Sequence, residues 1–424
     1  MKKIIIPIII FLLITFAYIY FTHTTNKNKI PPLKVEEQKL VLNNIYIYGT
    51  HLGLTGKINI LDDYDDIKLT LYNGDFKDYD VNYDNGIITI SENINDGLYL
   101  DPLDVGTYYA FLKVARTITT KEGNEELKYQ YYIIDNETNY KNMTYYTISN
   151  TNNKIKINSD NNYNTLMFNI NNNKEKNIYD ITIDPGHGGR DNGAEALGVR
   201  ETDLTMKIAT SLKKKLENLN LKIKLTHQEK QLSSSETMNE YGTHGRAVIP
   251  NEVHSKYTLS IHLNSNSSSK PHGLEIYTPV NINYDFANIL AKNIIEKTGI
   301  TPSTNKINKK YDAIYSRNFT TKEIEEDNNK KTSKGYKAYD ITEKSNYYYM
   351  IRETGGNMTG AYVDGRNPEI SEGNPYYNSN IGNETYLLEL GYLTNESDLN
   401  IITTKIEEYT TAIAEALKEN LKLS

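Results

Sequence analysis

The chain has 424 residues and a formal net charge of −7, with no cysteine and no tryptophan. This length allows two or three domains. The lack of cysteine excludes disulfides, thiolate metal sites and a cysteine nucleophile, so any metal or nucleophilic chemistry must use histidine, carboxylate or hydroxyl groups. No basic stripe stands out, so the charge pattern gives no reason to expect nucleic acid as a partner.

Residues 1–21 predict a membrane anchor that leaves the rest of the chain outside the cytoplasm. Lys2 and Lys3 precede an apolar run that extends from Ile4 to Phe21. A helix that crosses a bilayer needs roughly 17–25 such residues, and the lysines should stay on the cytoplasmic side. A cleaved signal peptide, which would release a secreted protein, is the alternative. The run ends in bulky side chains without a small-x-small cleavage site, which favours the anchor.

The next part of the chain predicts an all-β domain between two linkers. Residues 22–39 are polar, contain Pro31-Pro32 and are interpreted as a linker. Residues 40–170 alternate apolar and polar side chains in short runs separated by turn signals such as Asn73-Gly74. This pattern is typical of a β-sandwich-like domain. It carries no chemistry-bearing motif, so we interpret it as a spacer or as a wall- or partner-binding module. The Asn- and Lys-rich residues 171–178 predict a second linker.

From residue 179 the pattern changes to strands that alternate with helices, which predicts an α/β domain over 179–424 with a mostly parallel sheet flanked by helices. Residues 300–383 are polar and tyrosine-rich without clear periodicity, and we interpret them as a long insertion. The expected strands are Ile181–Asp184, Leu221–Leu225, Tyr257–Leu263, Leu274–Thr278 and Tyr386–Tyr392, and the expected helices are Glu201–Leu219, Tyr284–Lys297 and Lys405–Leu421.

Three polar residues fall at strand ends or at a helix start, where side chains of an open α/β sheet converge. They are His187, Glu201 and His262. Two imidazoles and a carboxylate are a usual set of ligands for catalytic zinc, which leaves a position for water. Glu389 lies within an apolar strand, where burying an ionised carboxylate without a partner is costly. Near a metal-bound water it could act as a general base. Each residue also has a structural interpretation, such as a salt bridge from Glu389 to Arg352 or Arg366.

Residues 179–424 resemble the zinc-dependent N-acetylmuramoyl-L-alanine amidases of the Amidase_3 family, which cleave peptidoglycan. Four segments carry the resemblance in the family's order: Ile183–Ala194, Arg200–Leu204, Leu259–Asn264 and Leu387–Asn395. The resemblance implies a twisted central sheet, zinc ligands at His187, Glu201 and His262, and a catalytic Glu389. It also implies hydrolysis of the amide between the lactyl group of N-acetylmuramic acid and L-alanine of the stem peptide.

The chain departs from the family pattern in two places. His227 stands where the family usually carries an arginine, and the 300–383 stretch is longer than in a typical member. This insertion could supply a carboxylate that blocks the zinc until a regulatory protein displaces it, or it could be a solvated charged loop. The candidate residues for such a plug are Glu323, Glu325, Glu326, Asp327 and Glu353.

Other polar residues keep open interpretations. Arg352 and Arg366 could bind carboxylates of the stem peptide or form structural salt bridges. His227 and the remaining histidines outside the motifs, at positions 244, 254 and 272, are interpreted as structural. The alternatives to an amidase are an inactive amidase-like protein that binds wall or a partner, and a zinc peptidase that cleaves within the stem peptide.

Overall fold

The computed structural model describes residues 33–59, 63–135, 143–160, 164–228, 245–333, 335, 338, 341–355 and 380–423. The predicted membrane anchor at 1–21 lies outside these residues. Within them, none of the helices combines the length and the apolar composition that crossing a bilayer requires.

The N-terminal half of the described chain is β-rich. Twelve strands of this region and β21 form one 13-stranded sheet, with the order β10-β11-β12-β8-β9-β1-β2-β6-β5 along its main path. β3 pairs with β8 and β4, and β7 pairs with β2. Side chains that alternate along these strands fill one core, which includes Leu40, Leu69, Phe168 and Ile170. The strands are β1 (Val35–Tyr48), β2 (His51–Lys57), β3 (Asp66–Tyr72), β4 (Phe76–Asp80), β5 (Asn82–Asp84), β6 (Ile87–Thr89), β7 (Leu98–Tyr99), β8 (Gly106–Thr119), β9 (Glu125–Asp135), β10 (Met143–Tyr146), β11 (Asn153–Ser159) and β12 (Leu166–Asn172).

The start of β1 differs from the sequence-based boundary. We expected a linker up to residue 39, but β1 begins at Val35 and pairs with β9 in parallel. Lys39 forms an ion pair with the buried Asp135 at 2.8 Å. The polar residues that suggested a linker lie on a partly exposed strand instead, where alternation cannot be read because their neighbours are also polar.

The C-terminal half contains a seven-stranded sheet in the order β16-β13-β17-β22-β18-β20-β19. Four of its neighbouring pairs are parallel, whereas β18–β22 and β19–β20 are antiparallel. The sheet is therefore mostly parallel, as predicted. Its strands are β13 (Ile181–Pro185), β16 (Ile223–Leu225), β17 (Tyr257–Asn264), β18 (Glu275–Tyr277), β19 (Lys309–Tyr311), β20 (Ile314–Tyr315) and β22 (Glu384–Tyr392); β14 (Glu195–Ala196) and β15 (Val199–Arg200) form a separate hairpin.

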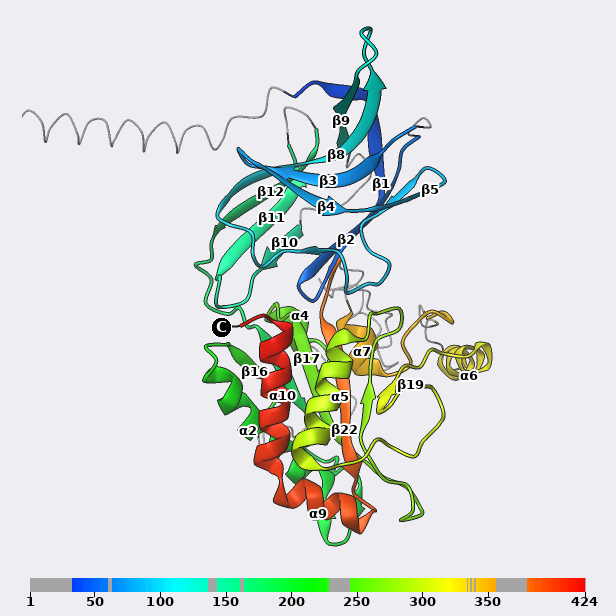
Figure 1. Ribbon diagram of the computed structural model, residues 1–424. Coiled ribbons are helices and arrows are strands. Elements are labelled where there is room, and N and C mark those ends of the chain that lie inside the picture. The colour runs from blue at the N-terminus through cyan, green and yellow to red at the C-terminus, as the bar shows by residue number, and fades with distance from the viewer. Residues whose placement is uncertain are drawn as a thin grey trace, which may run out of the picture.

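Three long helices cover one face of this sheet, and Figure 1 shows them side by side. They are α2 (Glu201–Glu217), α5 (Asp285–Thr298) and α10 (Ile406–Asn420). Their apolar stripes share a core with alternate residues of the sheet, including Ile183, Leu259 and Leu388. Leu387 points to the other face, where it packs with Tyr277, Tyr315 and Ile351. The other helices in the described ranges are α4 (Ile249–Glu252), α6 (Thr321–Thr332), α7 (Tyr349–Thr354) and α9 (Glu396–Thr404).

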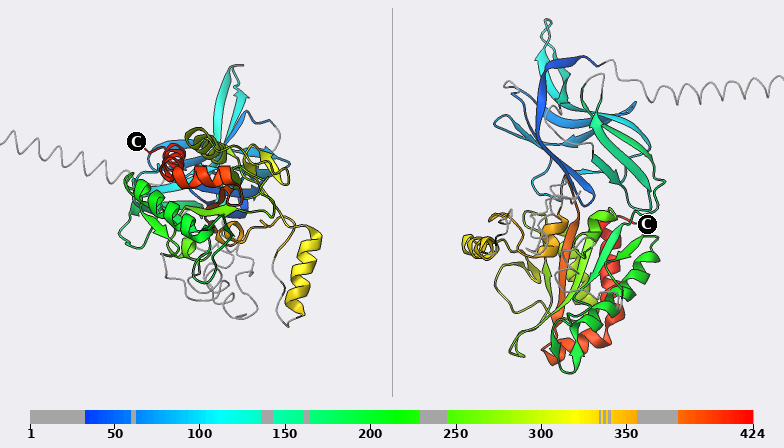
Figure 2. Two further views of the ribbon diagram at one scale, coloured as in Figure 1. Left: turned by 90° about the horizontal axis from the view of Figure 1, so that it is seen from below. Right: turned by 180° about the vertical axis from the view of Figure 1, so that it is seen from behind.

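The stretch interpreted as an insertion is partly regular. β19 and β20 extend the central sheet, α7 packs on β22, and β21 (Ile381–Gly382) pairs in parallel with β1 of the β-rich sheet. The helix α6 projects away from both sheets in the two views of Figure 2. Periodicity missed the strands because two or three residues are too short to show it, and it missed α6 because nearly all of its residues are polar.

The two halves meet through buried polar contacts. The backbone N–H and the hydroxyl of Ser149 donate to Asp180 at 2.9 and 2.5 Å. Asn95 donates to the carboxylate of Glu384 at 3.2 Å, and Ile148 belongs to the core of the C-terminal half. Since β21 also pairs with β1 of the β-rich sheet, the two halves are joined by strand pairing as well as by side-chain contacts.

Candidate metal centre

His187 follows β13 on a sharply turned backbone. The chain stays close to β17 there: Gly186 donates its N–H to the carbonyl of Ile261 at 2.8 Å. A Cβ atom on Gly186 would lie 2.5 Å from the ring of His262, so only glycine permits this approach. His187 itself has a φ of +67°, in the left-handed region. The turn places its imidazole next to that of His262, with ring centroids 4.9 Å apart.

Glu201 begins α2 and is 3% exposed. Backbone N–H groups fix both oxygens of its carboxylate, because Ala194 donates to Oε2 and Leu263 donates to Oε1, each at 2.9 Å. Oε2 also lies 3.1 Å from Nε2 of His187, and Oε1 lies 3.2 Å from Nδ1 of His262. The carboxylate therefore faces both imidazoles from a fixed position.

The structure brings the three predicted ligands together. Each of His187, Glu201 and His262 offers one possible metal-ligand atom, and these three atoms lie within 4.8 Å of one another. We call these residues the His–Glu–His cluster. Burial lowers the pKa of His187, but the carboxylates of Glu201 and Asp191 outweigh it and raise the pKa to about 9. Burial raises the pKa of Glu201, but the two histidines hold it well below its usual range. The cluster thus stabilises positive charge, as a cation site must.

Asp191 orients the first histidine. Its Oδ2 lies 2.6 Å from Nδ1 of His187, and its Oδ1 accepts the N–H of Gly193 at 2.9 Å. This contact occupies Nδ1 and leaves Nε2 for a ligand, an arrangement that metal-binding histidines commonly have. Asp191 belongs to the Ile183–Ala194 segment, but the sequence alone indicated no role for it. Its position four residues after His187 in a glycine-rich turn was the available signal.

Glu389 lies on β22, beside the cluster. It is the register partner of His262 on the neighbouring strand β17, so the two side chains leave the same face of the sheet. Its Oε2 is buried and has no hydrogen-bond partner among the described residues. Burial raises the pKa of Glu389 well above its usual value, and the carboxylates of Glu201 and Glu275 add to the shift. A carboxyl group in this environment is suited to take up a proton.

The charged residues that offered alternative interpretations have other partners. Arg352 donates to the buried carboxylate of Glu353 at 2.8 Å and to the backbone carbonyl of Tyr347 at 2.6 Å. Glu323 is paired with Arg317. The structural interpretation of Arg352 therefore holds, and neither Glu323 nor Glu353 presents an unpaired carboxylate. Arg366 and His244 lie outside the described residues.

Sequence reasoning missed two buried carboxylates behind the site. Glu275 lies opposite Glu389 across β18 and β22 and accepts the hydroxyls of Ser303, Tyr392 and Tyr277 at 2.6, 2.6 and 2.5 Å. Asp184, at the end of β13, is bound by Arg246 through two nitrogens at 2.7 and 2.8 Å. A charged residue inside an apolar strand was the signal in both cases.

Comparisons with known proteins point to one family. The family model described as N-acetylmuramoyl-L-alanine amidase (Amidase_3) matches residues 181–419, more than half of the chain. The chain is 36% identical over 98 residues to the sporulation-specific N-acetylmuramoyl-L-alanine amidase of Bacillus subtilis (strain 168), a match that covers 23% of this chain and 34% of that protein.

A second curated relative, the N-acetylmuramoyl-L-alanine amidase CwlM of Bacillus licheniformis, is 35% identical over 99 residues, which are 23% of this chain and 35% of the relative. The matches thus span about a third of these relatives' length. Among solved structures, the catalytic domain of CwlV, an amidase from Bacillus (Paenibacillus) polymyxa var. colistinus, aligns with a TM-score of 0.38 and 19% identity over 58% of this chain and 100% of that one. The family match confirms the resemblance seen in the motifs, and the chain belongs to the Amidase_3 family of N-acetylmuramoyl-L-alanine amidases.

Proposed function

We propose that the chain is a zinc-dependent N-acetylmuramoyl-L-alanine amidase that hydrolyses peptidoglycan at the bond between muramic acid and L-alanine. The observation that carries the proposal is the His–Glu–His cluster with Glu389 on the adjacent strand, whose buried Oε2 has no hydrogen-bond partner in the part of the chain that the structure describes. Family membership supplies the substrate class and the identity of the bond.

The residues of the cluster fit zinc. Two imidazole nitrogens and a carboxylate oxygen are a usual catalytic set, and the contact between Asp191 and His187 adds the outer hydrogen bond that such sites carry. Gly193 belongs to the same fit, since a Cβ atom there would lie 2.6 Å from the ring of His187 and 2.7 Å from Oε2 of Glu201. Nε2 of His187, Nδ1 of His262 and the carboxylate of Glu201 would hold the metal.

When bound, zinc supplies the Lewis acidity that activates water and polarises a carbonyl oxygen. Residues of the chain then transfer a proton from the attacking water to the leaving group. Glu389 takes the proton of the attacking water as a general base. Glu389 then delivers the proton to the departing nitrogen of L-alanine. Asp191 holds the ring of His187 in place through Nδ1, the nitrogen that does not face the metal position.

Digestion of peptidoglycan by the full chain tests the proposal, with products identified by mass spectrometry and bound metal measured alongside. We expect release of stem peptides with a free L-alanine N-terminus. Glu389→Gln should reduce this release by roughly 10²–10⁴-fold, the usual contribution of a general base, while zinc stays bound. Glu419→Gln is the matched control, because Glu419 is exposed on α10.

Other products would identify the alternatives. Cleavage inside the stem peptide would replace the amidase by a zinc peptidase. Zinc binding and wall binding without any released peptide would identify an inactive amidase-like binding protein. Equal activity of Glu389→Gln and the parent chain would remove Glu389 from the mechanism.

A further inference from the structure

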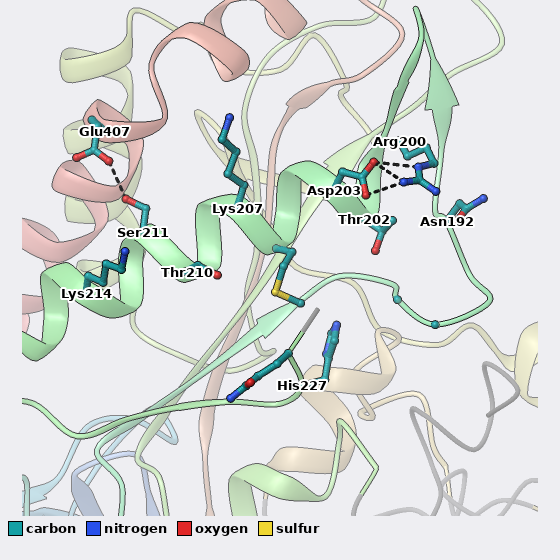
Figure 3. A pocket seen from close by; sticks show the side chains of 14 residues that line it. Asn192, Arg200, Thr202, Asp203, Lys207, Thr210, Ser211, Lys214, His227 and Glu407 are labelled. Carbon is teal, nitrogen blue, oxygen red and sulfur yellow. Dashed lines mark hydrogen bonds and ion pairs between the residues drawn. The ribbon is translucent and has the colours of Figure 1, made fainter. Parts of the chain in front are cut away.

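The cavity beside α2 does not include Glu389. This cavity has a volume of about 890 Å³ and begins at Gly188 and Gly189, the two residues that follow His187. Figure 3 shows polar side chains of α2 along one side of it and His227 on the other. Glu389 is not one of the described residues that line it. The position of the Glu389 carboxyl group therefore has to be explained by β22 and by the segments on which β22 packs.

Strand β22 carries one extra residue directly after Glu389. Glu389 is the register partner of His262 on β17. The next pair joins Tyr392 to Asn264, so β22 advances by three residues where β17 advances by two. This is a β-bulge, a feature that redirects side chains next to active sites. Without it, alternation would place Tyr392 in the core with Leu390; with it, Tyr392 lies on the face that carries Glu389.

Glu275 on β18 binds the redirected tyrosine. It is the register partner of Glu389 in the antiparallel pair of β18 and β22, so both side chains leave the same face of the sheet. The hydroxyl of Tyr392 donates to Oε1 of Glu275 at 2.6 Å. This contact ties the bulged end of β22 to β18 at the position opposite Glu389.

Two further segments fix the carboxylate of Glu275, which is 0% exposed. Ser303 donates its hydroxyl to Oε1 at 2.6 Å, and Tyr277 donates its hydroxyl to Oε2 at 2.5 Å. The side-chain amide of Asn305 lies 3.5 Å from Oε2. Ser303 and Asn305 stand at the start of the stretch that the sequence analysis interpreted as an insertion. A buried carboxylate is costly unless it is hydrogen-bonded, and these donors hold Glu275 in one position.

The carboxyl group of Glu389 is not fixed in this way. Its buried Oε2 has no hydrogen-bond partner among the described residues. Tyr277 and Tyr392 lie on the same face, but each hydroxyl has a single hydrogen and donates it to Glu275. The placement of Glu389 therefore depends on where the backbone of β22 is held, and Glu275 is the residue that holds it at this point.

We propose that Glu275 is a positioning residue for Glu389: its carboxylate fixes the bulged end of β22 against β18 and so keeps the carboxyl group of Glu389 beside the His–Glu–His cluster. The inference rests on the proposed function, which assigns the proton transfer to Glu389. A general base must lie within hydrogen-bond reach of the proton that it takes, and a misplacement of about 1 Å can cost on the order of 10²-fold in rate.

Glu275→Gln in the full chain tests the proposal, because the amide keeps the size of the side chain but offers one acceptor oxygen in place of two. For release of stem peptides from soluble wall fragments, we expect kcat to fall roughly 10–10²-fold, while KM and the bound zinc stay close to the parent values. Glu384→Gln is the matched control. Glu384 is also buried and accepts the hydroxyl of a tyrosine, Tyr386, but its side chain leaves the other face of β22.

Tyr392→Phe is the second variant and removes one donor to Glu275, so the test stands even if Glu275→Gln does not fold. We expect a smaller fall in kcat in the same direction. Tyr145→Phe is its control, because the buried hydroxyl of Tyr145 donates to the carboxylate of Asp101 at 2.7 Å in the β-rich half. In a Glu389→Gln background, neither Glu275→Gln nor Tyr392→Phe should lower the residual release further, since both act through Glu389.

The kinetics can overturn the proposal in two ways. A kcat equal to that of the parent in both variants would show that Glu389 does not depend on Glu275. An equal further loss of activity in the Glu389→Gln background would show that Glu275 acts on the fold and not through Glu389.

Crystal structures of the parent chain and the variants separate this inference from the proposed function. We expect the carboxyl group of Glu389 to be displaced by about 1 Å or more, or to occupy more than one conformer, in Glu275→Gln and Tyr392→Phe but not in the two controls. An unchanged Glu389 overturns the positioning role even if the parent chain is an active amidase. A displaced Glu389 in a chain that releases no stem peptide supports the positioning role while the proposed function fails.

Discussion

The buried carboxyl group of Glu384 should make stability depend on pH in a direction that can be worked out. Glu384 is 2% exposed at the junction of the two halves, where it accepts hydrogen bonds from Asn95 and Tyr386. Burial raises its pKa from the usual 4.5 to about 7. The folded chain therefore keeps this proton between pH 4.5 and 7, where the unfolded chain has lost it. Stability contributed by the protonated group is present at low pH and is lost as the pH rises through 7.

Glu384→Gln removes this loss, because the amide oxygen can still accept both hydrogen bonds and never ionises. The rise in the pKa of Glu384 from 4.5 to about 7 corresponds to a free energy of unfolding on the order of 3 kcal/mol, at about 1.36 kcal/mol per pKa unit. We expect equal stability of the parent and the variant near pH 4.5, and a variant that is more stable by about this amount at pH 8. The measurement is chemical unfolding at both pH values, with the exposed Glu419→Gln as control. A difference that does not change with pH would refute the reasoning.

Three further changes probe the metal site and its support. Asp191→Asn should weaken zinc affinity roughly 10–100-fold, measured by competition with a chelating dye; unchanged affinity would deny Asp191 its orienting role. Gly193→Ala should abolish zinc binding, because its Cβ would lie 2.6 Å from the ring of the first histidine, whereas Gly198→Ala, with a similar positive φ and nothing within 4 Å, should bind zinc normally. Arg246→Leu should cost about 3–5 kcal/mol in unfolding free energy, since it leaves the carboxylate of Asp184 buried without its cation; a loss under about 1 kcal/mol would contradict this.

The parts of the molecule that sequence predicted depend on local patterns. The strand before His187, the helix that starts at Glu201 and the strand that carries His262 each show a periodicity and a stop signal within about a dozen residues. Parallel strands then bring their carboxyl ends to one edge, so residues at those ends could be grouped without coordinates. The prediction of a mostly parallel sheet succeeded for the same reason.

The parts that sequence could not predict depend on contacts between distant segments. β21 is two residues long and acquires its conformation only by pairing with β1, more than 300 residues earlier. The tautomer of His227 depends on the acceptor of the single hydroxyl hydrogen of Thr226, which requires the position of Asp184. Glu275 likewise looks like an isolated charge until three hydroxyl donors from other segments surround it.

Strand β22 places Glu384 and Glu389 on opposite faces of the sheet. Glu384 and Tyr386 share one face, which continues through Leu388 into the core beneath α10. Glu389 leaves the opposite face with Leu387, beside Tyr277 and toward the cluster. Because alternate residues of a strand point to opposite sides, a change at Glu384 should alter the junction of the two halves without altering the surroundings of Glu389. Glu384→Gln should therefore change the pH dependence of unfolding and leave peptidoglycan hydrolysis intact; a loss of hydrolysis with zinc still bound would mean that β22 transmits the change along its length.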